Sequence, residues 1–446
     1  MASPVPAPRR SQVRWLILAL LTGFSVVSYI ERINLTVSAR FIRDEFRLSD
    51  TQIGWSFSIF LFSYTMAQLP AGMLVDRFGA RRVLSVAAVF WFLITLLLGI
   101  LVGRLAVDAA QVVAALIAMR LLLGLAESPT FPGAASTVAR WFPPSARGMP
   151  NAIIQSASYA GEALTLILMA TITAWLGWRN ALYASALPAL LLALLWWRFG
   201  ASRPRDDPRV SPAELAYIER REWAPVVTPS QQSLRLLLNP KLLFLSLGYF
   251  CQGYVTYLFF FWFYIYLVDE RHFSIAAGGW VGALPTIAAA VCAFGGGHLS
   301  DSLARRFGPI PGRRGLIVAA GLGGGACLLV GAFARQPWLA VAGFATAIGT
   351  RGLVESAFWS TINDIGGDSS GMAGGAMNCM GNFGGVVSTA IAPFLVAALG
   401  WNTAMGIAAG ATALSGLLMF GLVDAKVRPD TSAEGMAVQR HDHQPT

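Results

Sequence analysis

The chain has 446 residues, of which 55% are hydrophobic and only 13% are charged. Soluble domains carry roughly 25% charged residues, so this composition indicates an integral membrane protein. The formal net charge of +10 would suit nucleic-acid binding, but most Lys and Arg residues lie in alternate loops between apolar stretches and in the two tails. That placement is the positive-inside signature of membrane topology. It predicts that both termini are cytoplasmic and argues against a nucleic-acid partner.

Twelve stretches are apolar and long enough for membrane-spanning helices, which need ~20 apolar residues each. In chain order they are residues 14–39, 51–75, 83–104, 110–139, 148–174, 180–199, 241–268, 275–300, 314–334, 338–363, 371–398 and 401–424. No small-residue cleavage site follows the first stretch, so we expect a retained span and not a signal peptide. The pattern predicts an all-α integral membrane protein with twelve transmembrane helices.

The segment 200–240 is the only long polar interruption, and it is rich in proline and charge. Because it separates six apolar stretches from six, we predict one six-helix bundle at 14–199 and another at 241–424. The segment between them is predicted to be a cytoplasmic linker. Short cytoplasmic tails are predicted at 1–13 and 425–446.

The two halves resemble each other in sequence. "GMLVDRFGARR" starts at Gly72, and the weaker match "GHLSDSLARR" starts 225 positions later at Gly297. "RGMPNAIIQSASYAG" ends at Gly161, and "SGMAGGAMNCMGNFG" ends 223 positions later at Gly384. Two matches at nearly one offset indicate a duplicated six-helix unit and pseudo-symmetric bundles. Secondary transporters typically have this architecture, with the binding site at the interface of the repeats.

The first of these repeated motifs predicts a gating latch at the cytoplasmic ends of the halves. Gly72 allows two helices to approach, and Asp76 can cap a helix or pair with arginines of the opposite half. Arg77 follows in the motif, and Asp301 is the counterpart of Asp76. The alternative is a basic loop that only sets the topology.

Seven ionisable residues lie inside predicted spans, where a charge costs at least ~2.5–3.5 kcal/mol. Away from the ends of the spans, these are the acidic and basic residues Glu31, Arg32, Arg120, Glu127, Glu162, Arg351 and Glu355. Arginine stays protonated at physiological pH, and its planar fork fits a carboxylate. Glutamate can change its charge, because burial favours the neutral acid. Fixed cations beside switchable anions suit an organic anion that travels with protons.

Structural alternatives remain open for these charges. The whole set could form internal salt bridges that only hold helices together. Arg351 and Glu355 lie four residues apart, so they could satisfy each other on one helix. Glu162 could line a wet pore without carrying a proton.

Polar residues align in the second repeat match. Gln155 aligns with Asn378, and Tyr159 aligns with Asn382. We therefore expect these side chains to face a central cavity from both halves and to contact the substrate.

Neither an enzyme nor a cofactor-binding protein is expected. All four cysteines fall inside predicted spans, which suggests neither a disulfide nor a metal site. The chain has no nucleophile–base pair, metal cluster or phosphate loop in a plausible setting.

Four segments together resemble a known transporter family. They are "YIERINLTVSA", "GMLVDRFGARR", "MRLLLGLAESPTFPGAASTVARWFPPSARG" and "GGAMNCMGNFGG". They resemble the anion:cation symporter family of the major facilitator superfamily, which includes bacterial transporters of galactonate and glucarate. The resemblance implies import of a small organic anion, a sugar acid or other carboxylate, by proton symport through alternating access. It implies a monomer in the lipid bilayer of a bacterial inner membrane.

The resemblance also assigns roles to residues. It implies that Glu31 and Glu127 couple protons and that Arg32 contacts the substrate anion. Arg120 belongs to the same charged cluster, and we expect it to bind the substrate as well. Further positions that match the family's substrate site are Tyr29, Gln155, Asn378 and Asn382.

Three intramembrane charges depart from the family pattern, namely Glu162, Arg351 and Glu355. The extra arginine, Arg351, could receive a second carboxylate or a distal polar group of the substrate.

These roles suggest a competition between the acids and the substrate for the arginines. Unprotonated glutamates would neutralise the arginines and keep an anion out, whereas protonated glutamates would release them. Two alternatives stay open. One is a proton-independent uniporter or exchanger of organic anions, and the other is a permease-like sensor.

Overall fold

The computed structural model describes the chain except for residues 1–10, 107, 144–145, 220–237, 367–369 and 422–446. Most of both predicted tails and much of the predicted linker therefore lie outside the described residues. Within the described ranges every regular element is a helix, in agreement with the all-α prediction.

The helices fall into two groups along the chain. The first comprises α1 (Val13–Phe46), α2 (Asp50–Phe78), α3 (Ala80–Ile100), the π-helical turn η1 (Leu101–Leu105), α4 (Ala109–Glu127), α5 (Thr130–Trp141) and α6 (Gly148–Phe199). Next come the short η3 (Pro204–Asp206) and α7 (Pro212–Ile218). The second group comprises α9 (Pro240–Asp269), α10 (Ile275–Phe307), α11 (Pro309–Phe333), α12 (Pro337–Gly366), α13 (Ser370–Leu417) and η5 (Leu418–Gly421).

Nine helices of the described chain are long and apolar enough to cross a membrane. Two of them, α6 and α13, bend at Gly177 and Gly400, whose φ angles are 80° and 76°. Glycine adopts this backbone region without the steric cost that other residues meet there. Each bend falls between two of the predicted apolar stretches. The number twelve and the location of the termini remain predictions.

The helix in the predicted stretch 110–139 is interrupted, although the whole segment is one candidate span. α4 ends at Glu127 and α5 begins at Thr130. Pro129 lies at this break. Proline interrupts a helix because it has no N–H to donate and its ring clashes with the preceding turn. The break places Glu127 at a helix end.

The pattern of helix neighbours in the first half recurs in the second. α1 packs on α6 as α9 packs on α13, and α2 packs on α4 as α10 packs on α12. Gly161 of α6 lies against the Val26 carbonyl of α1, and Gly384 of α13 lies against the Phe250 carbonyl of α9. At both places a Cβ would clash with backbone, so glycine is what allows the two helices to touch.

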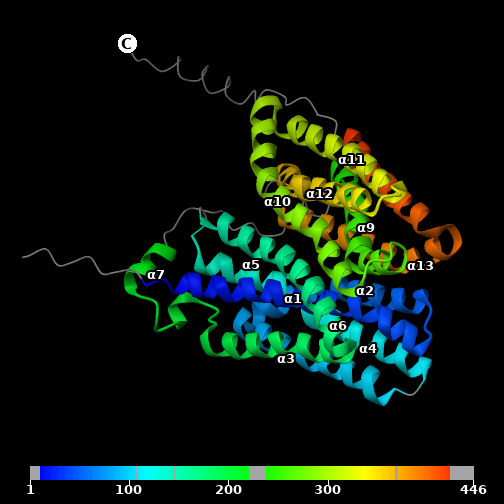
Figure 1. Cartoon of the computed structure of the whole chain (residues 1–446). Coiled ribbons are helices and arrows are strands. Elements are labelled where there is room, and N and C mark those ends of the chain that lie inside the picture. The colour runs from blue at the N-terminus through cyan, green and yellow to red at the C-terminus, as the bar shows by residue number, and fades with distance from the viewer. Residues whose placement is uncertain (1–10, 107, 144–145, 220–237, 367–369, 422–446) are drawn as a thin grey trace, which may run out of the picture.

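The halves meet through α2 with α13, α6 with α10, and α1 with α9. In Figure 1 the two sets of ribbons cross near α2 and α9 and diverge toward the side where α7 lies. We call that side the linker end and the opposite side, where α1 ends, the far end.

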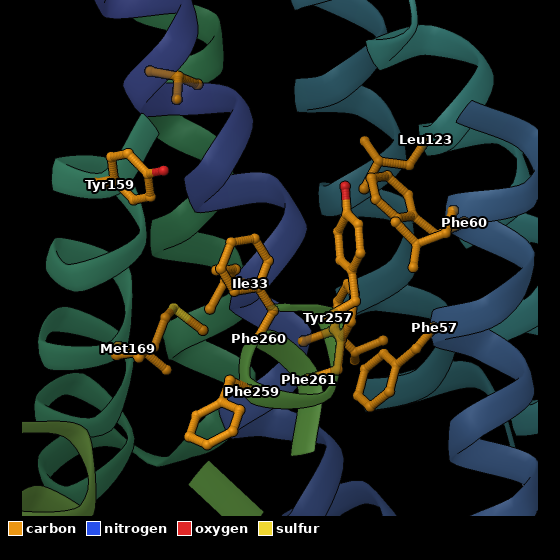
Figure 2. Packing of buried hydrophobic residues seen from close by; sticks show 14 of the residues in the cluster. Ile33, Phe57, Phe60, Leu123, Tyr159, Met169, Tyr257, Phe259, Phe260 and Phe261 are labelled. Atoms are coloured by element: carbon orange, nitrogen blue, oxygen red, sulfur yellow. The ribbon is translucent and has the colours of Figure 1, made fainter. Parts of the chain in front are cut away.

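The far end is held closed by ion pairs between α1 and α9. Arg40 Nε lies 2.5 Å from Asp269 Oδ1, and Arg43 Nη2 lies 2.7 Å from Asp269 Oδ2. Further inside, Phe57 of α2 stacks on Phe261 of α9 with ring centroids 4.7 Å apart. Figure 2 shows both residues in the packed core between the helices. Charged and aromatic contacts therefore join the halves on this side.

At the linker end, α7 is fixed to the first half. The fully buried carboxylate of Glu214 accepts hydrogen bonds from the backbone N–H groups of Val13 (3.1 Å) and Arg14 (3.2 Å). Both donors lie in the first turn of α1, where N–H groups lack partners within the helix. The first part of the predicted linker thus caps α1.

Candidate functional site

A cavity of about 260 Å³ lies between the halves. It joins a wider groove of about 810 Å³ formed by the start of α6, the end of α10 and α12, which lies toward the linker end. Ligand pockets typically measure ~300–1,000 Å³, so the inner cavity lies just below this range and suits only a small molecule. Its polar lining comprises Tyr29, Arg32, Tyr64, Gln68, Gln155, Tyr159, Tyr249, Thr256, Tyr257, Arg351, Glu355, Asn378 and Asn382.

Arg32 of α1 forms a buried ion pair in the cavity wall. Its Nε lies 2.7 Å from Oε2 of Glu127, the last residue of α4, and the two side chains are 2% and 0% exposed. Its guanidinium also lies over the Tyr64 ring, 4.2 Å from the centroid. Within the described residues Nη2 of Arg32 and Oε1 of Glu127 have no hydrogen-bond partner. The arginine therefore retains a free donor while its charge is balanced.

Arg120 does not line the cavity in this conformation, and its predicted contact with substrate remains a prediction. Its Nη1 and Nη2 donate to the backbone carbonyls of Glu31 (3.2 Å) and Arg32 (3.0 Å). Arg120 points toward α1, and both of its Nη groups are bonded to the α1 backbone instead of facing the cavity. It braces the segment of α1 that carries Arg32.

The carboxylate of Glu31 is also outside the cavity lining. Its Oε2 accepts hydrogen bonds from Thr95 Oγ1 of α3 (2.5 Å) and from Asn34 Nδ2 (3.3 Å). Consecutive helical residues point ~100° apart, so Glu31 and Arg32 face different neighbours. The predicted competition of Glu31 for Arg32 is therefore absent from this arrangement.

A second arginine–glutamate pair lines the cavity from α12. Arg351 Nη2 lies 3.4 Å from Glu355 Oε2, one helical turn away, and the side chains are 14% and 15% exposed. Glu355 Oε1 accepts hydrogen bonds from Tyr249 (2.7 Å) and Trp359 (3.0 Å). The two charges satisfy each other, as the alternative interpretation of this pair expected, yet both also face the cavity.

Arg351 also contacts the first half. Its Nη1 donates to Tyr159 Oη of α6 at 3.1 Å, while its Nε is buried without a partner in the described residues. Arg351 thus joins α6 to α12 across the cavity.

Glu162 lies one turn beyond Tyr159 on α6, outside the main cavity. Its Oε1 accepts a hydrogen bond from Thr286 Oγ1 of α10 at 2.6 Å, and its side chain is buried. It lines a small side cavity together with Tyr159 and Arg351.

The aligned amides face the cavity as expected. Asn378 Nδ2 donates to Gln68 Oε1 of the other half at 3.3 Å, and Asn382 Oδ1 accepts from Tyr257 at 2.7 Å. Tyr29, Gln155 and Tyr159 also lie in the lining. Their predicted contact with substrate remains a prediction.

Several lining residues were not predicted as site residues, notably Tyr64, Gln68, Tyr249 and Trp359. Tyr64 and Gln68 lie four residues apart on α2, so they share a face of a mostly apolar helix. This four-residue spacing was the signal from which Tyr64 and Gln68 could have been predicted as lining residues. Tyr249 and Trp359 both donate hydrogen bonds to Glu355. Trp359 lies four residues after Glu355 on α12, so the same spacing signal was available for it, whereas no sequence pattern connects Tyr249 to either residue.

The predicted latch residues lie toward the linker end. Gly72, Asp76 and Arg77 are in the last turns of α2. Asp301 of α10 lies 4.0 Å from Arg313 of α11, in its own half. Within the described ranges no ion pair joins either aspartate to the opposite half, so the latch remains a prediction for a conformation with a closed linker end.

Comparisons with known proteins agree with this architecture. The model of the Major Facilitator Superfamily matches residues 15–389 and 279–441. The "Probable galactarate/D-glucarate transporter" of Bacillus subtilis (strain 168) is 30% identical over 442 residues, covering 96% of this chain and 95% of the relative. The "D-galactonate transporter" of Escherichia coli O6:H1 is 27% identical over 439 residues, covering 96% and 99%.

A solved structure shares the fold. The bacterial homologue of the human lysosomal transporter Spinster superimposes with a TM-score of 0.71 at 18% identity. The match covers 93% of this chain and 95% of that chain. At this identity the likeness concerns the fold alone.

Proposed function

Because the chain belongs to the Major Facilitator Superfamily, we propose that it is a secondary active transporter of a small organic anion, carried together with protons. The observation that supports this most strongly is the buried Arg32–Glu127 pair in the wall of a cavity between two halves. A fixed cation can bind a carboxylate, and a buried acid can release that cation by taking up a proton.

The pair provides a mechanism for coupling. Ionised Glu127 occupies Nε of Arg32, so a substrate carboxylate must compete with it for the guanidinium fork. When Glu127 is protonated, the fork is free for a bidentate contact with the substrate. Proton and anion then favour each other's binding, and thermodynamic linkage requires the effect to be reciprocal.

Glu31 remains a second candidate for proton coupling by a less direct route. It hydrogen-bonds to Thr95 of α3, and Arg120 holds the backbone of the same α1 segment. A change of charge on Glu31 would therefore act on the position of α1, and through it on Arg32.

The closed far end and the groove toward the linker end suit alternating access. Under the predicted topology the linker end is cytoplasmic, so the cavity in this conformation faces the cytoplasm. Opening to the other side requires the Arg40–Asp269 and Arg43–Asp269 pairs to separate. In that conformation we expect Asp76 and Asp301 to engage the opposite half.

Arg351 favours a substrate with a second anionic or polar end. Arg351 lines the cavity from the second half, whereas Arg32 lines it from the first half, and the Nε of Arg351 is unpaired in the described residues. Relatives of the chain are named transporters of galactarate, D-glucarate and D-galactonate. We propose a sugar acid as the substrate, with the diacids as the first compounds to test.

The test is uptake by proteoliposomes that contain the purified protein, with radiolabelled galactarate, D-glucarate and D-galactonate as probes. Acidification of the outside should raise the accumulation of at least one of them, and a protonophore should lower it. Counterflow that proceeds equally well with and without a pH gradient would instead support the uniporter or exchanger.

A further inference from the structure

Glu162 occupies a distinctive place in the interface between the halves. It projects from α6 toward α10, where its only hydrogen-bond partner in the described residues is Thr286. Its Oε2 is buried and unpartnered, and the side chain is 3% exposed. The mechanism at Arg32 and Glu127 does not use this carboxyl group.

The surroundings of Glu162 favour the neutral acid. No cation of the described chain lies within 4.0 Å of it, and a buried carboxylate without a partner is costly. Arg351 of α12 lines the same side cavity, but it is paired with Glu355. Two acids, the buried Glu162 and the partly exposed Glu355, therefore lie near one arginine in this region.

The remaining groups around Glu162 supply no further fixed charge. The titratable groups are Tyr159 on its own helix and Tyr29 on α1, whereas α10 contributes Thr286. The rest of the side cavity comes from α9, from α10 and from Ile348 of α12, and none of these residues is ionisable. A proton is the simplest neutralising group for Glu162.

A short route connects Glu162 to the main cavity. The side cavity measures about 10 Å³, close to the ~10–15 Å³ that a single water needs. Tyr159 and Arg351 line both this space and the main cavity. A water there could pass a proton from Glu162 toward the Tyr159 hydroxyl and on to the groove at the linker end.

The contact that buries Glu162 lies in the part of the molecule that must open for far-side access. Gly279 lies near the start of α10, and Thr286 lies further along, within the first half of this helix. Gly279 packs against the backbone of Leu166 on α6 so closely that a Cβ would clash. Separation of α10 from α6 at the far end would remove these neighbours and let water reach Glu162.

We propose that Glu162 is a third proton-binding site, whose neutral form stabilises the packing of α6 on α10 while the far end is closed. The charged form of Glu162 is more stable when α6 and α10 have separated, because water then reaches the carboxylate. The proton is therefore bound more tightly in the closed arrangement, and a rise in pH shifts the population toward the open one. The proposal rests on the proposed function for its role in transport, but the site itself can be tested without substrate.

The first experiment measures the protonated carboxyl band in the infrared spectrum of the purified protein as pH is raised. Glu162→Gln should remove one protonated carboxyl that persists to neutral pH in the unsubstituted protein. Identical protonated-acid bands in both proteins would show that Glu162 is ionised and would overturn the proposal.

The second experiment follows the far end directly. Spin labels replace the exposed Trp175 of α6 and Trp280 of α10, in a background whose native cysteines are substituted, and distances are measured as pH rises. Longer distances should gain population with pH, and Glu162→Gln should reduce this shift at least twofold. Glu31 and Glu127 remain in the variant and account for any residual shift. An undiminished shift would contradict the proposal.

Two threonine variants control for a merely structural effect. Thr286→Val removes the hydrogen bond to Glu162 and should increase the population with long distances at acidic pH. Thr165→Val removes a buried hydroxyl of α6 whose one partner among the described residues is the Gly161 carbonyl of its own helix, and it should leave the distances unchanged. Equal effects of the two variants would attribute the shift to packing, against the proposal. If the unsubstituted protein shows the pH-dependent distances but does not transport galactarate, that result would count against the proposed function and not against this proposal.

Discussion

The two arginine–glutamate pairs in the cavity wall differ in how they are built. Arg32 and Glu127 come from two helices, lie 2.7 Å apart and are almost fully buried. Arg351 and Glu355 lie one turn apart on a single helix, 3.4 Å from each other, and are partly exposed. The first pair depends on how helices pack, whereas the second would form on α12 alone.

This difference indicates which pair can act as a switch. Breaking a buried pair by removing one partner costs ~3–5 kcal/mol, whereas a solvent-exposed i,i+4 pair is worth only ~0.3–0.5 kcal/mol. Arg351 and Glu355 are 14% and 15% exposed, so their pair lies between these two limits. Proton uptake by Glu127 therefore changes the state of Arg32 greatly. Glu355 also accepts hydrogen bonds from Tyr249 and Trp359, so Arg351 is not its only partner. We therefore propose that the first pair takes part in coupling and that the second contributes to anion recognition without coupling.

Glu127→Gln should have the largest effect, the complete loss of accumulation against a gradient. Glutamine resembles the protonated acid in size and charge, so Arg32 should stay available to the anion and binding should persist. Equilibrium binding at two pH values and active accumulation, both with galactarate, test this on one preparation.

The matched exchange in the other pair is Glu355→Gln, which should keep the pH-driven accumulation even if it alters affinity. If Glu127 only braces α4, its variant should instead express poorly and melt at a lower temperature, because Arg32 loses its partner. Unimpaired accumulation by a well-folded Glu127→Gln protein would remove this residue from the proton path.

Arg32→Lys should weaken substrate binding by about 30-fold, which corresponds to the lower end of the ~2–5 kcal/mol lost when one partner of a buried charge pair is altered. Lysine keeps the charge but has no planar fork for a bidentate contact, and it cannot pair with Glu127 and a carboxylate in the same geometry. Calorimetric titration with galactarate measures the change. Unchanged affinity would make Arg32 a purely structural partner of Glu127.

Arg351→Lys should have the smallest effect, a loss of affinity of about 5-fold, or ~1 kcal/mol. The loss should be greater for galactarate, which has two carboxylates, than for D-galactonate, which has one. Parallel titrations of the two acids sharpen the comparison between the pairs. Equal losses for both acids would mean that Arg351 does not receive the second carboxylate.

Much of the fold could be predicted from the sequence because its signals are local. The apolar stretches match the helices closely, and the gaps after residues 174 and 398 contain the glycine bends at Gly177 and Gly400. Helix length and the cost of exposing backbone in lipid leave few alternatives for such stretches. The repeat match also aligned residues from two halves that line one cavity.

The neighbour to which each intramembrane charged side chain points could not be predicted in the same way. The sequence predicted one charged cluster of Glu31, Arg32, Arg120 and Glu127. Of these four residues only Arg32 lines the cavity, and Glu127 lies behind it. Arg120 is bound to the α1 backbone, and Glu31 to Thr95 of α3.

The sequence alone thus determined the helices, the duplication and the presence of costly charges within spans. Only the tertiary structure decided that Arg32 is paired with Glu127, that Arg351 reaches Tyr159, and that Glu162 meets Thr286 across the halves. The physical reason is that helical periodicity gives the face on which a residue lies, whereas the group that meets that face is chosen by the packing of distant helices.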